Sequence, residues 1–371
     1  MDVLIILAFG IVLGAVGFWG WRKRSAGGPV PAFARTESDN SADAMFEQGM
    51  AFRRGQDLEL DFQAARRLLR RAAEMNHAQA QYEYGSMLFR GLGGEQDPVK
   101  GLRWIEHAAK SGCTDARLYM GKCHINGDGV EKNPVRAELY LRGVAEIGQA
   151  EAQTLLGMLH RDSEPPLGDA VLAAGWLTKA VGQRYPGAFF PLSDLYERGV
   201  GVVQDVKKAD ELLLQAAEFG DPQAQLKVAR YYLTGAFGHA FPQDYRAALD
   251  WFRRAASHGV AEAEYEIGVR YERNEGVDAP DMGVAIASYL KAAEMGFAPA
   301  QYRIGQVFLY GQGVNQNLRE ARRWFAAAAA QGHGEAAKYA KKLEGHVSEA
   351  PLLARTMPVD QAHDNEPEWK G

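Results

Sequence analysis

The sequence predicts an all-α protein: an α-solenoid of about eight stacked helix-turn-helix repeats, preceded by one N-terminal transmembrane helix. Three observations lead to this prediction. The first 21 residues include a long uncharged apolar run, residues 42–344 repeat a pattern about every 36 residues, and each repeat has helix-start and helix-stop residues at matching places. Because one helix pair cannot bury its own apolar face, we expect the pairs to stack into a right-handed superhelix.

Composition limits the classes of function. The 371 residues are 47% hydrophobic and 24% charged, which is typical of a folded chain. A net charge of -5 argues against a nucleic-acid binder that relies on phosphate contacts. The two cysteines, Cys113 and Cys123, cannot build a disulfide framework or a four-thiolate zinc site, so we expect buried thiols in a reducing compartment.

The N-terminal segment is long and apolar enough to cross a membrane. Residues 3–21 contain no charge, and a helix of this length spans about 28 Å, close to the thickness of the bilayer core. Trp19 and Trp21 lie at its end, as aromatic residues do at a membrane interface. We therefore expect one transmembrane helix.

A basic cluster follows at once and predicts the orientation. Arg22, Lys23 and Arg24 come after the apolar run, whereas a cleaved signal peptide has its positive charge before a shorter apolar core. The Ala32-Phe33-Ala34 triplet, which resembles a cleavage site, lies beyond these charges. An uncleaved anchor is therefore favoured over a removed signal, and the positive-inside rule places the rest of the chain in the cytoplasm. We expect a single-pass protein of a bacterial inner membrane.

The two ends of the chain differ in composition from the repeats. Residues 22–41 combine the basic flank with a Gly-, Pro- and Ser-containing stretch and are predicted to form a flexible tether. Residues 345–371 contain prolines near acidic residues and no apolar period, which predicts a disordered tail. The solenoid with a C-terminal capping helix is assigned to residues 42–344.

Each repeat is predicted to contain two antiparallel helices. The repeats begin at Ala42, Ala78, Thr114, Ala150, Pro186, Pro222, Ala261 and Ala298, and a capping segment begins at Gly334. The first helix starts at an Ala-x-Ala pair and stops at a glycine suited to the left-handed cap conformation: Gly91, Gly127, Gly199, Gly235 or Gly311. An Asp or Asn then supplies the N-cap of the second helix: Asp97, Asn133, Asp205, Asp244, Asp281 or Asn317.

The second helix carries a small residue, a large residue three positions later, and in most repeats an Ala-Ala pair. Trp104 with Ala108 and Ala109 is one example. Glycines recur in the middle of first helices, where glycine costs roughly 0.5–1 kcal/mol relative to alanine. They are Gly49, Gly85, Gly121, Gly157, Gly268 and Gly305. We expect these glycines to allow close contact with the Ala-Ala side of the partner helix.

These features resemble the Sel-one-like repeat (SLR) family, a relative of the tetratricopeptide repeat. The resemblance covers residues 42–344 and rests on the Ala-x-Ala start, the Gly-x-Gly-Val turn at Gly127–Val130 and Gly311–Val314, the Asp or Asn cap, and the Trp before Ala-Ala. It implies an α-solenoid that binds proteins and organises complexes, often at bacterial envelopes. The family pattern implies no catalytic residue.

Three repeats depart from the pattern. The fourth replaces its glycine turn with the segment Asp162–Pro166, and the fifth has prolines at 186 and 191, so its first helix is expected to start late or kink. These prolines motivate the hypothesis that the middle of the array is a hinge. The sixth repeat inserts residues 236–241, a loop that either contacts a partner or packs on the protein itself, and self-packing is favoured.

A polar stripe is the candidate protein-binding surface. The second, sixth, ninth and thirteenth positions of the first helices share one face, and first helices usually line the concave side of a solenoid. The alternative for any single member is an ordinary solvated position. The stripe consists of Glu83, Ser86, Arg90, Lys122, Asn126, Asp194, Arg198, Lys227, Arg230, Glu266, Arg273, Arg303, Gln306 and Tyr310.

Sequence patterns for chemistry are absent. The chain has no phosphate-binding Gly-x-x-x-x-Gly-Lys-Ser/Thr loop, no His-Glu-x-x-His zinc helix and no Gly-x-Ser-x-Gly elbow. His77, His258 and His333 fall where repeats end, which favours capping over metal binding. We therefore expect no catalytic residue, cofactor, metal or small-molecule substrate.

Two functions remain. The favoured one is a membrane-anchored noncatalytic scaffold or adaptor that binds protein partners, including an envelope complex, and contacts the lipid bilayer through residues 3–21. The alternative is a periplasmic, envelope-side protein that binds or acts on cell-wall material, and it requires the opposite membrane orientation.

Overall fold

The computed structural model describes residues 41–55, 59–165, 167–235 and 239–344. The predicted transmembrane segment 3–21, nearly all of the tether and the tail 345–371 lie outside these ranges. Within the described residues, no helix has both the length and the apolar character needed to cross a membrane.

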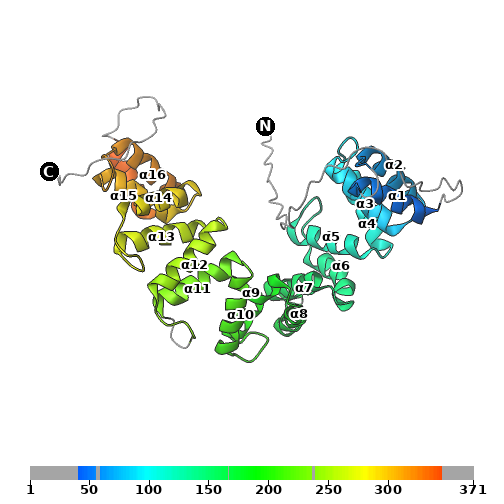
Figure 1. The fold of residues 1–371 in the computed structure, drawn as a ribbon, viewed down its shortest axis with the longest axis horizontal. Helices are drawn as coiled ribbons and strands as arrows, with labels where there is room; N and C mark the ends of the chain where they lie inside the picture. Colours follow the sequence, from blue (N-terminus) through cyan, green and yellow to red (C-terminus); the bar gives the residue numbers. More distant parts are fainter. Residues whose placement is uncertain (1–40, 56–58, 166, 236–238, 345–371) are drawn as a thin grey trace, which may run out of the picture.

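The described chain is all helical, and its helices stack as pairs into one arc (Figure 1). The first helices of the pairs are α1 (Ala42–Arg54), α3 (Ala78–Arg90), α5 (Thr114–Asn126), α7 (Ala150–Asp162), α9 (Phe189–Arg198), α11 (Pro222–Thr234), α13 (Ala261–Arg273) and α15 (Ala298–Tyr310). The second helices are α2 (Phe62–Glu74), α4 (Pro98–Lys110), α6 (Pro134–Glu146), α8 (Ala170–Gly182), α10 (Val206–Glu218), α12 (Tyr245–Ser257), α14 (Met282–Glu294) and α16 (Leu318–Ala330). A last helix, α17 (Gly334–Glu344), packs against α16.

The helix boundaries follow from local capping, as the sequence predicted. The five glycines expected to stop first helices have φ between 62° and 87°, which is the left-handed region. All six predicted Asp and Asn caps accept a hydrogen bond from a backbone amide of the following first turn, as in the 2.9 Å bond from Lys100 N to Asp97 Oδ1. Proline at the first position of α4 and α6 removes only an amide that has no partner within the helix.

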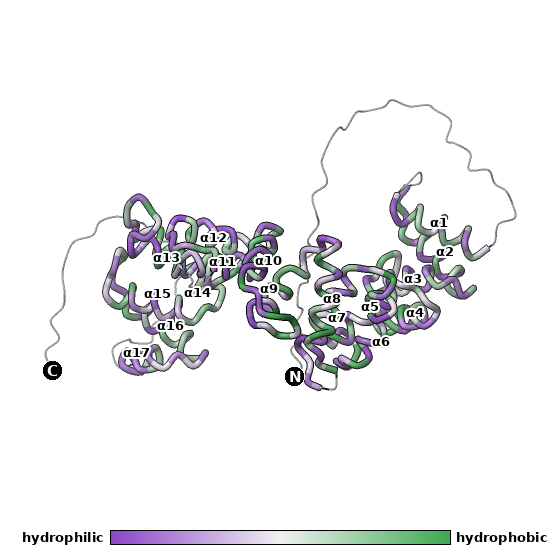
Figure 2. Tube along the Cα trace, turned by 90° about the horizontal axis from the view of Figure 1, so that it is seen from below, coloured by the Kyte–Doolittle hydropathy of each residue, from purple (hydrophilic) through white to green (hydrophobic). Residues whose placement is uncertain are grey.

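The core is a chain of hydrophobic clusters along the arc. Each cluster of buried residues draws on neighbouring helix pairs, so stability comes from the interfaces between repeats. Figure 2 shows hydrophobic and hydrophilic residues mixed within each helix, as expected for helices with one buried face. Each second helix has one large side chain that is almost fully buried, and where a large residue was predicted this side chain follows it by one position. These side chains, 0–2% exposed, are Leu69, Ile105, Leu141, Leu177, Leu213, Phe252, Tyr289 and Phe325.

The mid-helix glycines allow close packing, but their neighbour differs from the one expected. A Cβ at Gly85 would lie 2.7 Å from the Gly101 carbonyl oxygen and 2.8 Å from Ile105 Cγ1. A Cβ at Gly305 would lie 2.6 Å from the Phe325 ring. The glycines therefore make room for the large buried residue of the second helix, and not for the Ala-Ala pair.

The irregular middle of the array has a local explanation. α7 ends without a glycine, at Ser163 in an extended conformation. Pro186–Ala188 form a single 3-10 turn, η1, and α9 starts late, at Phe189, as predicted. Pro191 falls in the first turn of α9, where a missing amide proton costs no helical hydrogen bond. One hydrophobic cluster continues from α8 through α9 to α11, and the hinge stays a hypothesis.

The loop of the sixth repeat packs on the protein itself where it is described, as the sequence favoured. Phe241 is 4% exposed and contacts the rings of Tyr231 and Tyr232. His239 Nδ1 lies 2.6 Å from Asp210 Oδ1, and the amide of Ala240 donates to Asp210 Oδ2 at 2.7 Å. These contacts tie the loop to α10 of the preceding repeat.

Candidate functional site: the polar stripe of the first helices

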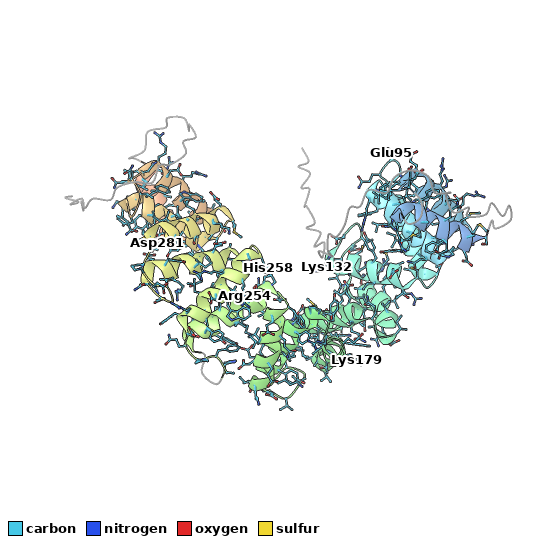
Figure 3. The ribbon with its side chains drawn as sticks, in the orientation of Figure 1. Glu95, Lys132, Lys179, Arg254, His258 and Asp281 are labelled. Carbon is cyan, nitrogen blue, oxygen red and sulfur yellow. The ribbon has the colours of Figure 1, made fainter. Side chains whose placement is uncertain are left out.

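The polar stripe lies on six of the first helices, α3, α5, α9, α11, α13 and α15. Near the middle of the arc, α7 and α9 lie nearer its open side than α8 and α10 (Figure 1). Charged side chains cover the remaining surface too, with Lys179 on the outer side of the arc (Figure 3). Much of the stripe is engaged in ion pairs between neighbouring repeats. These pairs join Glu83 to Arg53, Lys122 to Glu151, Lys227 to Glu197, Arg230 to Glu262, and Arg303 to Glu272.

Two of these pairs include a tyrosine. Glu197 accepts hydrogen bonds from Lys227 of the next repeat and from the Tyr231 hydroxyl. Burial alone would raise the pKa of Glu197, but these two donors outweigh it and lower the pKa below its ordinary value. Burial and the carboxylate together raise the pKa of Tyr231. This cluster therefore holds α9 and α11 in one relative orientation.

The same arrangement recurs near the C-terminal end. Glu272 accepts from Arg303 and, at 2.6 Å, from the Tyr289 hydroxyl. Burial opposes ionisation of Glu272, and the two donors again leave its pKa lowered. Arg303 also donates to Gln312 Oε1 at 2.8 Å. Members of the stripe at the sixth and ninth helix positions thus connect repeats, a role that a periodic pattern of polar residues does not reveal.

Other members of the stripe make local contacts. Asp194 and Arg198 form a pair at 3.2 Å within α9, and Gln306 donates to the Tyr302 hydroxyl at 3.1 Å. Asn126 donates to Asp128 in the following turn at 3.0 Å. Ser86 is partly buried on α3.

Glu266 is the member of the stripe whose environment opposes its charge. Burial raises its pKa, against the attraction of Arg270 at 3.3 Å. Arg270 is itself buried and has a second carboxylate partner, Glu275, at 2.8 Å. The charge of Arg270 is therefore balanced even without Glu266.

The thirteenth position of the first helices forms an exposed row. Five stripe members stand there, each at the last helical residue: Arg90, Asn126, Arg198, Arg273 and Tyr310. Arg54, Asp162 and Thr234 occupy the same place on α1, α7 and α11 and were missed by the sequence analysis, although the repeat register alone identifies them. A cation at a helix C-terminus is favoured by the helix dipole. We call these eight residues the terminal row.

Two of the three histidines expected to cap helices do so, and both cysteines are buried. His77 Nδ1 accepts from the Ala80 amide at 2.9 Å and His333 Nδ1 from the Ala336 amide at 3.2 Å, so both cap helices. Cys113 and Cys123 are buried free thiols, and burial raises the pKa of Cys123 to about 11. In the described ranges, no group of three or more His, Cys, Asp or Glu is arranged to hold a metal ion.

The helix pairs and the surface of paired charges define a repeat protein of the α-solenoid class. The Sel1 repeat pattern matches residues 42–77, 78–113, 114–142, 150–183, 192–221, 222–260, 261–297 and 298–333. The chain therefore belongs to the Sel1 repeat family.

Solved structures and curated proteins give two further comparisons. A protective antigen with an SLR fold from uropathogenic Escherichia coli superposes with a TM-score of 0.66 at 27% identity, covering 83% of this chain and 66% of that one. A Sel1 repeat protein from Oxalobacter formigenes superposes at 0.65 with 31% identity, covering 82% and 86%. The chitin synthase regulator SKT5 of Saccharomyces cerevisiae is 38% identical over 88 residues, which is 24% of this chain and 12% of that protein. Chitin synthase regulatory factor 3 of Schizosaccharomyces pombe is 33% identical over 96 residues, or 26% and 10%, so the chain spans about a tenth of these curated relatives.

Proposed function

We propose that this protein is a membrane-anchored, noncatalytic scaffold whose solenoid binds a partner protein through the terminal row. The observation that carries the proposal is the division of the polar stripe. Inner members are paired between repeats and hold the array in shape, while the terminal row stands exposed at the ends of first helices. Arginines at four of its eight positions, against a single aspartate, favour a partner with an acidic surface.

The comparisons support a role in binding. Sel1 repeat solenoids typically bind protein partners, and the two curated relatives are named as regulators of an enzyme, chitin synthase. A regulator of this kind acts by contacting another protein. The apolar run at residues 3–21 and the basic cluster Arg22–Arg24 support the anchor and a cytoplasmic solenoid. A tether to the membrane raises the effective concentration of a membrane-bound partner.

Crosslinking in intact membranes tests the binding role. The full-length protein is crosslinked and purified beside a variant in which Arg90, Arg198 and Arg273 are changed to Gln. We expect a discrete partner with the wild type and at least a fivefold loss with the variant. Recovery of the bait alone from the wild type, or equal recovery with both proteins, would reject the proposal.

Orientation needs a separate experiment because the periplasmic alternative depends on it. Reporter fusions at the C-terminus distinguish the two sides of the membrane. We expect activity of the cytoplasmic reporter. Activity of the periplasmic reporter would reject the cytoplasmic scaffold and favour the envelope-side protein.

A further inference from the structure

In several second helices the fifth residue packs against the connecting loop of the next repeat. A Cβ at Gly313 would lie 2.9 Å from Ile286 Cδ1, and a Cβ at Gly129 would meet Leu102 in the same way. An apolar side chain is the natural choice for this contact. In α2, however, the fifth residue is Arg66, and its guanidinium lies against Gly94 of the next loop, 2.6 Å from where a Cβ at Gly94 would stand.

The hydrogen-bonding groups of Arg66 are less completely paired than those of the acidic side chains at the fifth position of other second helices. In α10, the Asp210 carboxylate forms hydrogen bonds with the His239 ring and with the Ala240 amide. In α6, Glu138 forms an ion pair with Arg142. Arg66 donates from Nη2 to the Glu95 carbonyl at 2.9 Å, while its Nη1 is buried without a hydrogen-bond partner among the described residues. A buried guanidinium nitrogen without an acceptor is costly, and it leaves the positive charge of Arg66 incompletely compensated.

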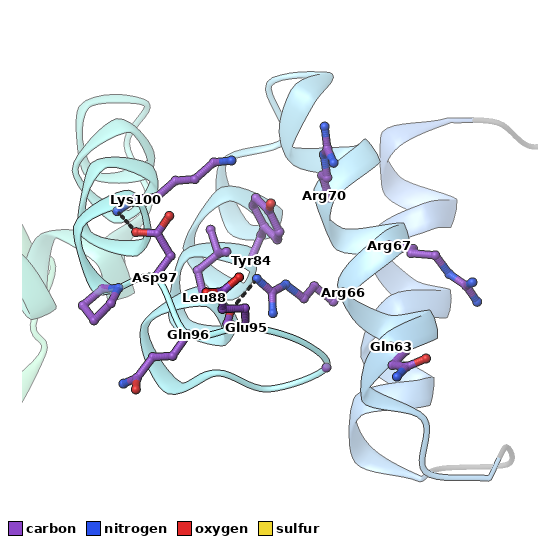
Figure 4. Close-up of a pocket in the computed structure, with 12 residues that line it drawn as sticks. Gln63, Arg66, Arg67, Arg70, Tyr84, Leu88, Glu95, Gln96, Asp97 and Lys100 are labelled. Carbon is purple, nitrogen blue, oxygen red and sulfur yellow. Dashed lines mark hydrogen bonds between the residues drawn. The ribbon is translucent and has the colours of Figure 1, made fainter.

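An open pocket of about 640 Å³ lies at this point, between α2 and the segment that leads into α4 (Figure 4). Arg66, Arg67 and Arg70 come from α2, and Lys100 from the opposite wall. Arg70 is paired with Glu74 in an exposed i,i+4 contact at 2.8 Å, a kind of pair that contributes little to stability and is easily exchanged.

The acidic side chains in the pocket balance this charge only in part. Glu95 and Asp97 also line the pocket, but Asp97 uses Oδ1 to cap the amide of Lys100. Arg67 points away from the pocket in Figure 4, so Arg66, Arg70 and Lys100 face two anionic side chains.

We propose that this pocket binds the carboxylates of an acidic, extended segment of a partner protein, an inference that rests on the proposed binding function. Arg66 and Arg70 lie one turn apart on α2, about 6 Å along the helix axis. Alternate side chains of an extended peptide are separated by nearly the same distance, about 6.5 Å. Glu95 and Asp97 would repel a densely charged phosphate backbone, which favours separate carboxylates.

A direct binding measurement tests the proposal without the natural partner. The probe is a fluorescent peptide of alternating serine and glutamate, titrated with the full-length protein in mild detergent at low salt and followed by anisotropy. We expect saturable binding that weakens as salt is added. Arg66→Leu is the main variant, because leucine already occupies this position in α4 and α12, at Leu102 and Leu249.

We expect Arg66→Leu to weaken peptide binding at least tenfold while the helical circular dichroism is unchanged. Lys100→Gln, on the opposite wall, should weaken it about threefold. Arg103→Leu is the matched control, since Arg103 is an exposed arginine of α4 outside the pocket. Its affinity should stay within twofold of the wild type.

Several results would overturn the inference. Wild-type affinity in Arg66→Leu, or an equal loss in Arg103→Leu, would show that the pocket is not the binding site. Tighter, Arg66-dependent binding of a phosphoserine peptide would replace carboxylate by phosphate as the ligand. Absence of a partner in the crosslinking experiment together with Arg66-dependent peptide binding would reject the terminal row as the docking surface and leave the pocket in place.

Discussion

Replacement of Gly85 by alanine tests the packing of the helix pairs directly. Gly85 lies in the middle of α3, and a Cβ there would stand 2.7 Å from the Gly101 carbonyl oxygen, 2.8 Å from Ile105 Cγ1 and 3.1 Å from the Ile105 amide nitrogen. Two of these three atoms belong to the backbone of α4, so they cannot move aside by changing a rotamer. The methyl group must therefore push the two helices apart.

Two opposing terms decide the size of the effect. Overpacking of a close contact costs about 1–3 kcal/mol, while alanine gains roughly 1 kcal/mol over glycine as a helix former. Because the contact is with backbone, we take the upper part of the first range and expect a net loss of about 1–2 kcal/mol. Gly175 of α8 is the matched control, since a Cβ there meets no atom within 4 Å. Gly175→Ala should raise stability by about 0.5–1 kcal/mol.

Urea unfolding of the full-length protein, followed by helical circular dichroism, measures both changes. Opposite shifts of the two midpoints are expected, with Gly85→Ala lower and Gly175→Ala higher than the wild type. If Gly85→Ala were as stable as the wild type, or if both variants lost stability equally, close helix contact would not be the reason for the mid-helix glycines.

Three further predictions concern single side chains. The pKa of Glu197 is lowered in the folded state. The ionised side chain therefore stabilises the fold above the ordinary glutamate pKa, and this stabilisation is lost as the pH falls through the folded pKa. Glu197→Gln should lower the free energy of unfolding at pH 7 and reduce the stability that is lost between about pH 5 and 3, as measured by urea unfolding. The pKa of Glu266 shifts in the opposite direction, because burial raises it. The ionised form of Glu266 therefore lowers the stability of the fold at neutral pH. Glu266→Gln should therefore be at least as stable as the wild type at pH 7, and a loss of more than 1 kcal/mol would contradict this reasoning. Asp205→Ala should cost about 1 kcal/mol by removing the cap on the Lys208 amide, whereas Asp205→Asn should cost little; equal losses in thermal unfolding would exclude a capping role.

Prediction from sequence was accurate where the signals are local. The repeat starts coincide with the first residues of the first helices, apart from the fifth repeat, where Pro186 begins the 3-10 turn and α9 follows at Phe189. A capping side chain acts on amides two or three residues away, and a left-handed glycine ends the helix next to it. Such interactions are encoded within a few residues and repeat with the period.

The candidate site was predicted only in part. Periodicity identified the polar face of the first helices and its members at the thirteenth position, such as Arg90 and Arg273. It did not reveal that Lys227 and Arg303 are held by carboxylates of the preceding repeat, about 30 residues earlier in the chain. Which side chains meet across such a distance depends on how one pair is rotated against the next.

The sequence by itself determined the helices, their caps, the repeat period and the family, because these rest on short-range chemistry repeated along the chain. Only the tertiary structure decided which stripe residues are paired and which stand exposed, and it alone placed Arg66 against the loop of the following repeat. The physical reason is that electrostatic and packing contacts between repeats depend on distances of a few ångströms between separate helix pairs. A linear pattern does not specify those distances.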